Sequence, residues 1–346
     1  MAADAARPGR WVLLLMVLAA FLLVPATPVV QSIMPVRDTS WLVVATLAIC
    51  TVIGWGAGGR AWLALMWVAV AIGVLAAAPV VQPTYATLER GWAILLAAAF
   101  GLVCETSPPT MRFFPRALTA LALTVSVAGL LAAATPGALG ASTDAVHADV
   151  SARPNAALAW MRATEQSPAW QQWRSTGVGS SLDGAVQTAD GVLTSLPDDA
   201  VPFFPALLAL ESLGALALAW GLYHRISRTR LGDQLAPLRD FAFSDQLVWG
   251  LIAGIALFVL PTAGAWRGTG VNLLVFFGAL YAVRGLGVLT WFLDASHAGA
   301  PVMVGLAILA ALLSAPAVVG LGLLGLGDTW MDWRHRSGGA TSRPTT

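Results

Sequence analysis

The chain alternates long apolar runs with short polar connections over most of its length. The apolar runs lie at about residues 11–34, 41–58, 61–81, 88–104, 115–135, 201–225, 246–265, 270–293 and 299–326. Each run is close to the roughly 20 residues that an α-helix needs to cross about 30 Å of hydrocarbon. Because backbone groups in a bilayer must be hydrogen-bonded internally, this pattern predicts an all-α, polytopic helical membrane protein.

The number of spans depends on the last run, residues 299–326, which contains interrupting Ser, Pro and Gly residues. If the N-terminus is cytoplasmic, nine arginines of the short loops and loop edges lie in the cytoplasm and three lie outside. Nine full spans would then place the Arg-containing tail outside. Two readings stay open: nine spans, or eight spans with a last segment that re-enters or tilts and returns to the cytoplasmic side.

Residues 136–200 interrupt the apolar pattern with an acidic, polar insert. Ser167 and Pro168 are a typical N-cap and first-turn pair for one short helix, and Asn155 can cap another. Further along, one apolar stripe follows helical spacing through Leu182, Val186, Ala189, Leu193 and Leu196. This stripe either packs on the protein itself or in the headgroup region, or offers a docking face to a partner.

The runs and the insert divide the chain into four parts. We expect N-terminal transmembrane helices in residues 1–135, an extracytoplasmic insert with amphipathic helices in 136–200, a C-terminal transmembrane region in 201–336, and a disordered tail in 337–346.

Composition supports an integral membrane protein, because 58% of the residues are hydrophobic and 11% are charged, against about 25% charged residues in soluble domains. The net charge of +1 gives no large basic field, so we expect no nucleic-acid partner. Cys50 and Cys104 both lie in apolar runs, and the four histidines show no ligand spacing. We therefore expect neither a metal site nor a cofactor.

Two charged residues inside apolar runs are candidates for an intramembrane site. Glu211 lies midway along residues 201–225, and Arg284 lies just past the middle of residues 270–293. An ionised side chain at the centre of a span costs about 2.5–3.5 kcal/mol, so each should face the bundle interior and find a partner. The simplest hypothesis is that they pair with each other, to fix helix register or to line a path for a ligand or ion. Alternatively, Glu211 is protonated and Arg284 bonds backbone carbonyls or reaches toward the interface.

Asn272 and Tyr281 lie in the same run as Arg284 and extend the candidate polar site. Tyr281 is three residues from Arg284 and so shares its helix face. At the end of the last run, alternating charges are either a solvated helix end or contacts for a cytoplasmic partner; they are Asp328, Asp332, Arg334 and Arg336.

Motifs for catalysis are lacking. The sequence GWGAGG at residues 54–59 matches G-x-G-x-x-G, but it connects two apolar runs instead of opening a βαβ unit. No G-x-S-x-G, H-E-x-x-H or Walker pattern occurs. We expect no catalytic residues and no enzyme activity.

The C-terminal half carries a series of ordered features: FFPALLALESLGALALAWGLYHR, then FAFSDQLVWGL, then NLLVFFGALYAVRGLGVL, and finally GLGLLGLGDTWMDWRHR. Over residues 201–336 the chain thereby resembles the YybS-like family of bacterial multi-pass membrane proteins. That family is distantly similar to the substrate-binding membrane components of energy-coupling-factor vitamin transporters. The resemblance implies a role in ligand binding or transport.

The leading functional expectation is therefore binding of a small solute, or association with a transport system. The alternative is a non-transporting structural or assembly protein that acts through the insert and the C-terminal tail. The expected partners are the lipid bilayer, a small-molecule ligand and a membrane or cytoplasmic protein. The expected location is the bacterial inner membrane, with a cytoplasmic N-terminus.

Overall fold

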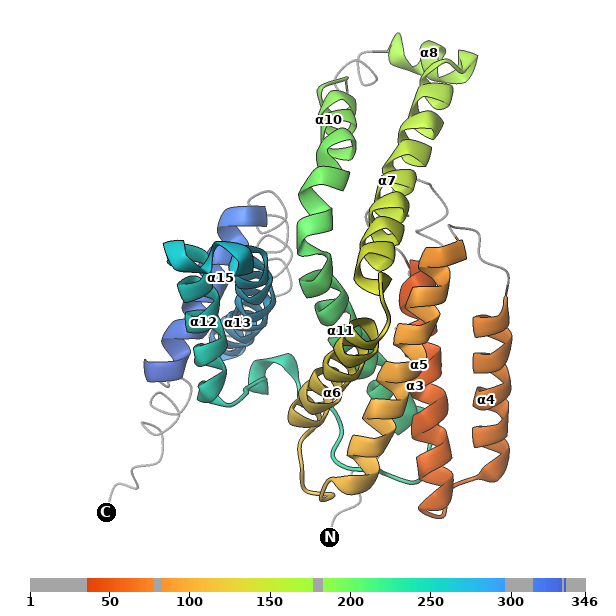
Figure 1. Ribbon diagram of the computed structural model, residues 1–346, viewed down its shortest axis with the longest axis vertical. Coiled ribbons are helices and arrows are strands. Elements are labelled where there is room, and N and C mark those ends of the chain that lie inside the picture. Colours follow the sequence, from red (N-terminus) through yellow and green to blue (C-terminus); the bar gives the residue numbers. More distant parts are fainter. Residues whose placement is uncertain (1–35, 78–82, 177–182, 296–313, 332, 334–346) are drawn as a thin grey trace. The chain divides into compact units, whose positions relative to one another are not determined.

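The computed structural model describes residues 36–77, 83–176, 183–295, 314–331 and 333. Every regular element within them is helical, which confirms the predicted all-α fold (Figure 1). The α-helices are α3 (Val36–Gly56), α4 (Ala61–Ala76), α5 (Pro83–Thr106), α6 (Phe113–Ala134), α7 (Ala138–Glu165), α8 (Pro168–Arg174), α10 (Asp183–Ala200), α11 (Phe204–Ile226), α12 (Val248–Val259), α13 (Arg267–Ala295) and α15 (Ser314–Met331). Short 3₁₀ turns are η2 (Val201–Phe203), η3 (Leu238–Asp240), η4 (Asp245–Leu247) and η5 (Pro261–Trp266).

Five of the described helices are long and apolar enough to cross a membrane: Thr39–Gly56, Thr84–Thr106, Phe113–Ala134, Val201–Ile226 and Gly264–Leu293. They coincide with five of the predicted runs. The runs at 61–81 and 246–265 instead form the shorter apolar helices Ala61–Ala76 and Asp245–Val259. The first run, 11–34, and the first half of the last one lie outside the described residues.

The chain divides into two compact units, of which the first contains residues 1–102 and 122–201. In this unit α7 and α10 form a hairpin with a small core in which Leu193 packs against Ala157 and Leu158. The predicted stripe on α10 thus faces its own neighbour, with Val186 and Ala189 half-buried beside it. Leu182 lies outside the described residues.

Of the two helix starts predicted in the insert, one is confirmed and one is wrong. The Ser167 side chain accepts a hydrogen bond from the Trp170 N–H at the start of α8, so this cap is confirmed. The start at Asn155 is wrong, because α7 continues through the buried Pro154 as one 28-residue helix. Proline removes one backbone hydrogen bond, and the core formed with α10 begins within one turn after it, at Ala157 and Leu158.

The second unit contains residues 103–121 and 202–346, and its helices α12, α13 and α15 pack through glycines. A Cβ on Gly285 would lie 1.9 Å from the Leu321 carbonyl oxygen, and one on Gly325 would lie 2.0 Å from that of Tyr281. Only glycine lets α13 and α15 approach backbone to backbone in this way.

These contacts fix the direction of α15. Tyr281 meets Gly325, and Arg284 meets Asp328, so partners on the two helices keep the same spacing along the chain. The helices therefore run parallel, whereas α12 runs antiparallel to α13, since Gly250 lies against Phe277 and Gly254 lies against Leu274 and Gly270. Parallel helices end on the same side, which agrees with the reading in which the last segment returns.

This arrangement predicts the side on which α15 ends. With Cys50 and Cys104 replaced by serine, cysteines introduced at Met331 and at Gln234, in the connection between α11 and α12, should react with an impermeant thiol reagent from the same face of membrane vesicles. Trp266→Cys, at the start of α13, should react from the opposite face. If Met331→Cys and Trp266→Cys reacted from the same face of the vesicles, parallel packing of α13 and α15 would be contradicted.

Candidate functional site

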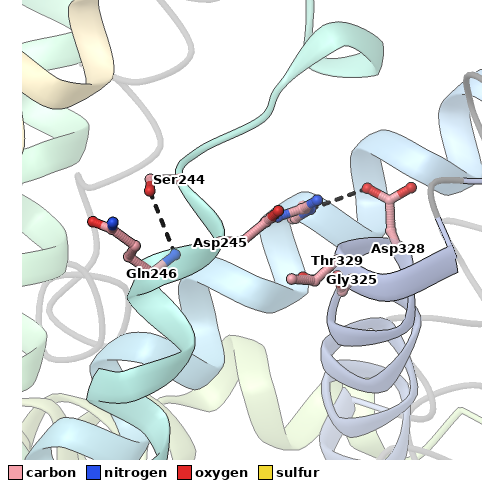
Figure 2. A network of polar contacts seen from close by, with 7 residues as sticks. Ser244, Asp245, Gln246, Gly325, Asp328 and Thr329 are labelled. Carbon is pink, nitrogen blue, oxygen red and sulfur yellow. Dashed lines mark hydrogen bonds and ion pairs between the residues drawn. The ribbon is translucent and has the colours of Figure 1, made fainter.

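The structure places Arg284 between two carboxylates. Its Nε donates to Asp328 Oδ2 at 3.0 Å, and its Nη1 donates to Asp245 Oδ1 at 3.0 Å. The two aspartates converge from different elements, Asp328 from α15 and Asp245 from the start of η4 (Figure 2). Three charged residues that are distant in sequence thus form one network.

Local sequence explains how both carboxylates reach the guanidinium. Asp328 follows Gly325 by three residues, so the close helix approach at Gly325 brings the next turn of α15 against Arg284. On the other side, the Ser244 side chain accepts a hydrogen bond from the Gln246 N–H and caps η4 (Figure 2). An acidic residue in the first turn of a helical segment is favoured by the partial positive charge there, which suits Asp245.

Aromatic rings form a wall beside the ion pairs. The Arg284 guanidinium lies 5.3 Å from the centre of the Phe243 ring, within the range of a cation–π contact. Phe243 in turn packs edge-to-face on Tyr281 at 5.1 Å and stacks on Phe114 at 5.6 Å. This wall gives the Arg284 guanidinium apolar surroundings, where charge interactions are stronger than in water.

The two ion pairs differ sharply in exposure. The Arg284 side chain is 7% exposed and that of Asp328 is 1% exposed, whereas the Asp245 side chain is 64% exposed. Removing one partner of a buried pair costs about 3–5 kcal/mol because an uncompensated charge remains. An exposed pair contributes about 0–1 kcal/mol. Asp328 is therefore the fixed partner of Arg284, and Asp245 is the exchangeable one.

A family model described as "Predicted membrane protein (DUF2232)" matches residues 156–329, which is half of the chain. The chain belongs to this family. The matched range includes Asp245, Arg284 and Asp328. No curated protein and no solved structure matches the chain.

The predicted pairing of Arg284 with Glu211 is wrong in this DUF2232 chain. Both ion pairs of Arg284 go to the aspartates. Glu211 is half-buried on α11 and makes interactions of its own. Equal depth in the membrane was the basis of the prediction, but depth alone does not make two helix faces adjacent.

Asn272 and Tyr281 take different places around this network. Asn272 ties α13 to the start of α11: its Nδ2 donates to the Pro202 carbonyl at 2.8 Å, and its Oδ1 accepts from the Ala206 N–H at 2.9 Å. It thereby satisfies an N–H that the first turn of a helix leaves unpaired. Tyr281 is 1% exposed and belongs to the aromatic wall beside Arg284.

Asp328, one of the candidate contacts for a cytoplasmic partner, lies in the interior and not at the surface. Its position near the polar end of the last run suggested exposure, yet close packing of α15 on α13 buries it against Arg284. The other three residues of that prediction, Asp332, Arg334 and Arg336, lie outside the described residues.

Sequence reasoning missed a second buried arginine, Arg116, which is 0% exposed. Its Nη1 donates to the Leu231 carbonyl and its Nη2 to the Pro108 carbonyl, both at 2.8 Å. The guanidinium lies 5.7 Å from the centre of the Trp220 ring. At the edge of an apolar run Arg116 looked like an ordinary cytoplasmic loop arginine, and only its position after two phenylalanines hinted at burial.

The arrangement offers charge recognition by a buried guanidinium. Across the described ranges, no three His, Cys, Asp or Glu side chains lie together in a way that could hold a metal ion. What the site can do is hold a guanidinium in apolar surroundings with one fixed and one exchangeable acceptor.

The difference between the two aspartates can be measured directly. Asp328→Asn should lower the free energy of unfolding by about 3–5 kcal/mol because it leaves Arg284 buried without its fixed counter-ion. Asp245→Asn, the matched control, should lower it by no more than about 1 kcal/mol. Thermal unfolding of the purified variants in detergent, followed by tryptophan fluorescence, compares them, and equal losses would refute the assignment of a fixed and an exchangeable partner.

Proposed function

We propose that this protein binds a small solute inside the membrane, as a transporter or as the binding component of a transport system. The observation that carries the proposal is the Arg284 guanidinium, held between the buried carboxylate of Asp328 and the exposed carboxylate of Asp245. Intramembrane ionisable residues commonly mark the paths of substrates and ions.

A purely structural role would need only one of the two contacts. The Asp328 pair alone compensates the charge of Arg284 and connects α13 with α15. Asp245 adds a second negative charge on a largely exposed side chain, so the network carries more negative than positive charge when all three residues are ionised. We expect such an extra negative charge where the carboxylate of Asp245 gives way to the anionic group of a solute when the solute binds Arg284.

The backbone around Asp245 supports the same proposal. The 12-residue helix α12 lies between the 3₁₀ turns η4 and η5 and is shorter than a membrane span. Broken helices within a membrane are tolerated where they are buried in protein or line a water-filled cavity, and transporters bind substrates at such breaks.

The chemistry of the site suggests the class of solute. A carboxylate or other anionic group can replace Asp245 on Nη1 and leave Arg284 fully compensated. The favoured solute is therefore a small anion that reaches the Arg284 guanidinium from the exposed side, where Asp245 lies. We assign the protein no catalytic step.

Resemblance to the YybS-like family, and through it to the binding components of energy-coupling-factor transporters, supports the same role. With it we place the protein in the bacterial inner membrane, with a cytoplasmic N-terminus. The arginines that follow α11 then face the cytoplasm, as the positive-inside rule requires.

One observation favours the alternative role as an assembly protein. The α7–α10 hairpin has its own small core, and Trp160 and Trp173 on α7 and α8 are 41% and 37% exposed. Exposed aromatic residues are common at protein interfaces. A partner protein that binds this hairpin would support the alternative.

Purification in a mild detergent tests the proposal. Native mass spectrometry should show a small anion bound stoichiometrically to the wild-type protein, and Arg284→Gln should lose it. Asp245→Asn should retain or strengthen it, because the competing carboxylate is gone. Glu211→Gln is the control and should bind as the wild type does. A bound protein in place of a small molecule, with all variants alike, would contradict the proposal and favour assembly.

A further inference from the structure

The connection after α11, residues 227–235, folds back over the end of that helix and is held there by buried side chains. The carbonyl oxygens of Thr229, Leu231, Gly232 and Asp233 all point inward. They accept hydrogen bonds from the Tyr223 hydroxyl at 2.7 Å, Arg116 Nη1 at 2.8 Å and Trp220 Nε1 at 3.0 Å, and the carbonyl of Gly232 meets His224 Nε2 at 3.0 Å. Leu235 then packs near Gly221.

The donors themselves are anchored. Trp220 and Tyr223 are 0% exposed, like Arg116, and the Trp220 ring packs against His224 at 4.5 Å. A Cβ on Gly232 would lie 2.8 Å from Arg116 Nη1, so a side chain there would disturb the anchor. The backbone of this connection is therefore a preorganised platform.

The outer surface of the platform is basic. Arg228 and Arg230 flank Thr229, whose carbonyl is fixed inward, and both arginines are exposed, as is Arg225 in the last turn of α11. None of the three has an ion pair with any residue that the structure describes. Arg239, in contrast, lies 3.8 Å from Asp240.

The position of this surface indicates what it meets. The membrane-spanning helix ends at Ile226, so the three arginines begin where the hydrocarbon ends. Leu235, at the end of this connection, and Leu238, in the following turn η3, are 39% and 41% exposed. Exposed arginines next to exposed leucines at the end of a span match the charged headgroups and the acyl boundary of a bilayer.

We propose that Arg225, Arg228 and Arg230 form a binding surface for the headgroups of anionic phospholipids. The platform holds the arginines in place before the lipid binds, which reduces the entropy lost on binding. Each arginine forms charge-assisted hydrogen bonds to a lipid phosphate. This surface is distinct from the Arg284 network and does not depend on solute binding.

The test measures lipid preference. Wild-type protein in detergent is mixed with equal amounts of phosphatidylglycerol and phosphatidylcholine, and native mass spectrometry gives the ratio of the two bound lipids. The wild type should prefer phosphatidylglycerol, and Arg228→Gln with Arg230→Gln should lower the ratio roughly tenfold or more, since one arginine near an anionic surface contributes about fivefold.

A matched control removes two exposed arginines from the hairpin, Arg162→Gln with Arg174→Gln, and should leave the ratio unchanged. An equal fall in both double variants would show a general charge effect and overturn the proposal, as would an unchanged ratio in the first. Binding of an acidic protein or of nucleic acid at these arginines, without lipid preference, would also overturn it. In the wild type the preference should weaken as salt rises from about 50 to 500 mM, and a salt-independent preference would contradict it.

Discussion

The fold of the C-terminal unit depends on one constraint, which is that a guanidinium buried among helices must keep a carboxylate beside it. Arg284 is almost fully buried, and the carboxylate that compensates its charge most completely, that of Asp328 on α15, lies 44 residues further along the chain. In the structure the pair forms with α15 parallel to α13, and the glycines at 285 and 325 allow this close approach. The ion pair and the close glycine contacts therefore stabilise the same arrangement of α13 and α15.

The charge of the second buried arginine, Arg116, is compensated without a carboxylate from the described residues. Arg116 bonds two backbone carbonyls and lies over the Trp220 ring. One of these carbonyls, that of Pro108, comes two residues after the C-terminal end of α5 at Thr106. The partial negative charge at a helix C-terminus favours a cation. The connection from α11 to α12 is therefore held by Arg116 at its beginning and by Arg284, through Asp245, at its end. Of these two contacts, only the second is an ion pair.

The sequence was sufficient to predict the helical class, because runs of about 20 apolar residues have few other solutions in a membrane. It also identified Arg284, since a charge inside such a run is costly. Its partner could not be found in this way. Asp328 lies close to a polar tail and looks exposed, and its burial depends on the direction and register of α15. Arg116 was missed because exposed loop arginines are common at the edge of an apolar run, so its position did not indicate burial.

Whether the Arg284–Asp328 pair holds α13 and α15 together is tested most directly by a double-mutant cycle. Arg284→Leu and Asp328→Leu are made singly and together, and the free energy of unfolding is measured in detergent. Each single change should cost about 3–5 kcal/mol, because it leaves one buried charge, while the double change should cost far less than their sum. Additive losses would contradict the account, since they would mean that the two side chains stabilise the protein independently.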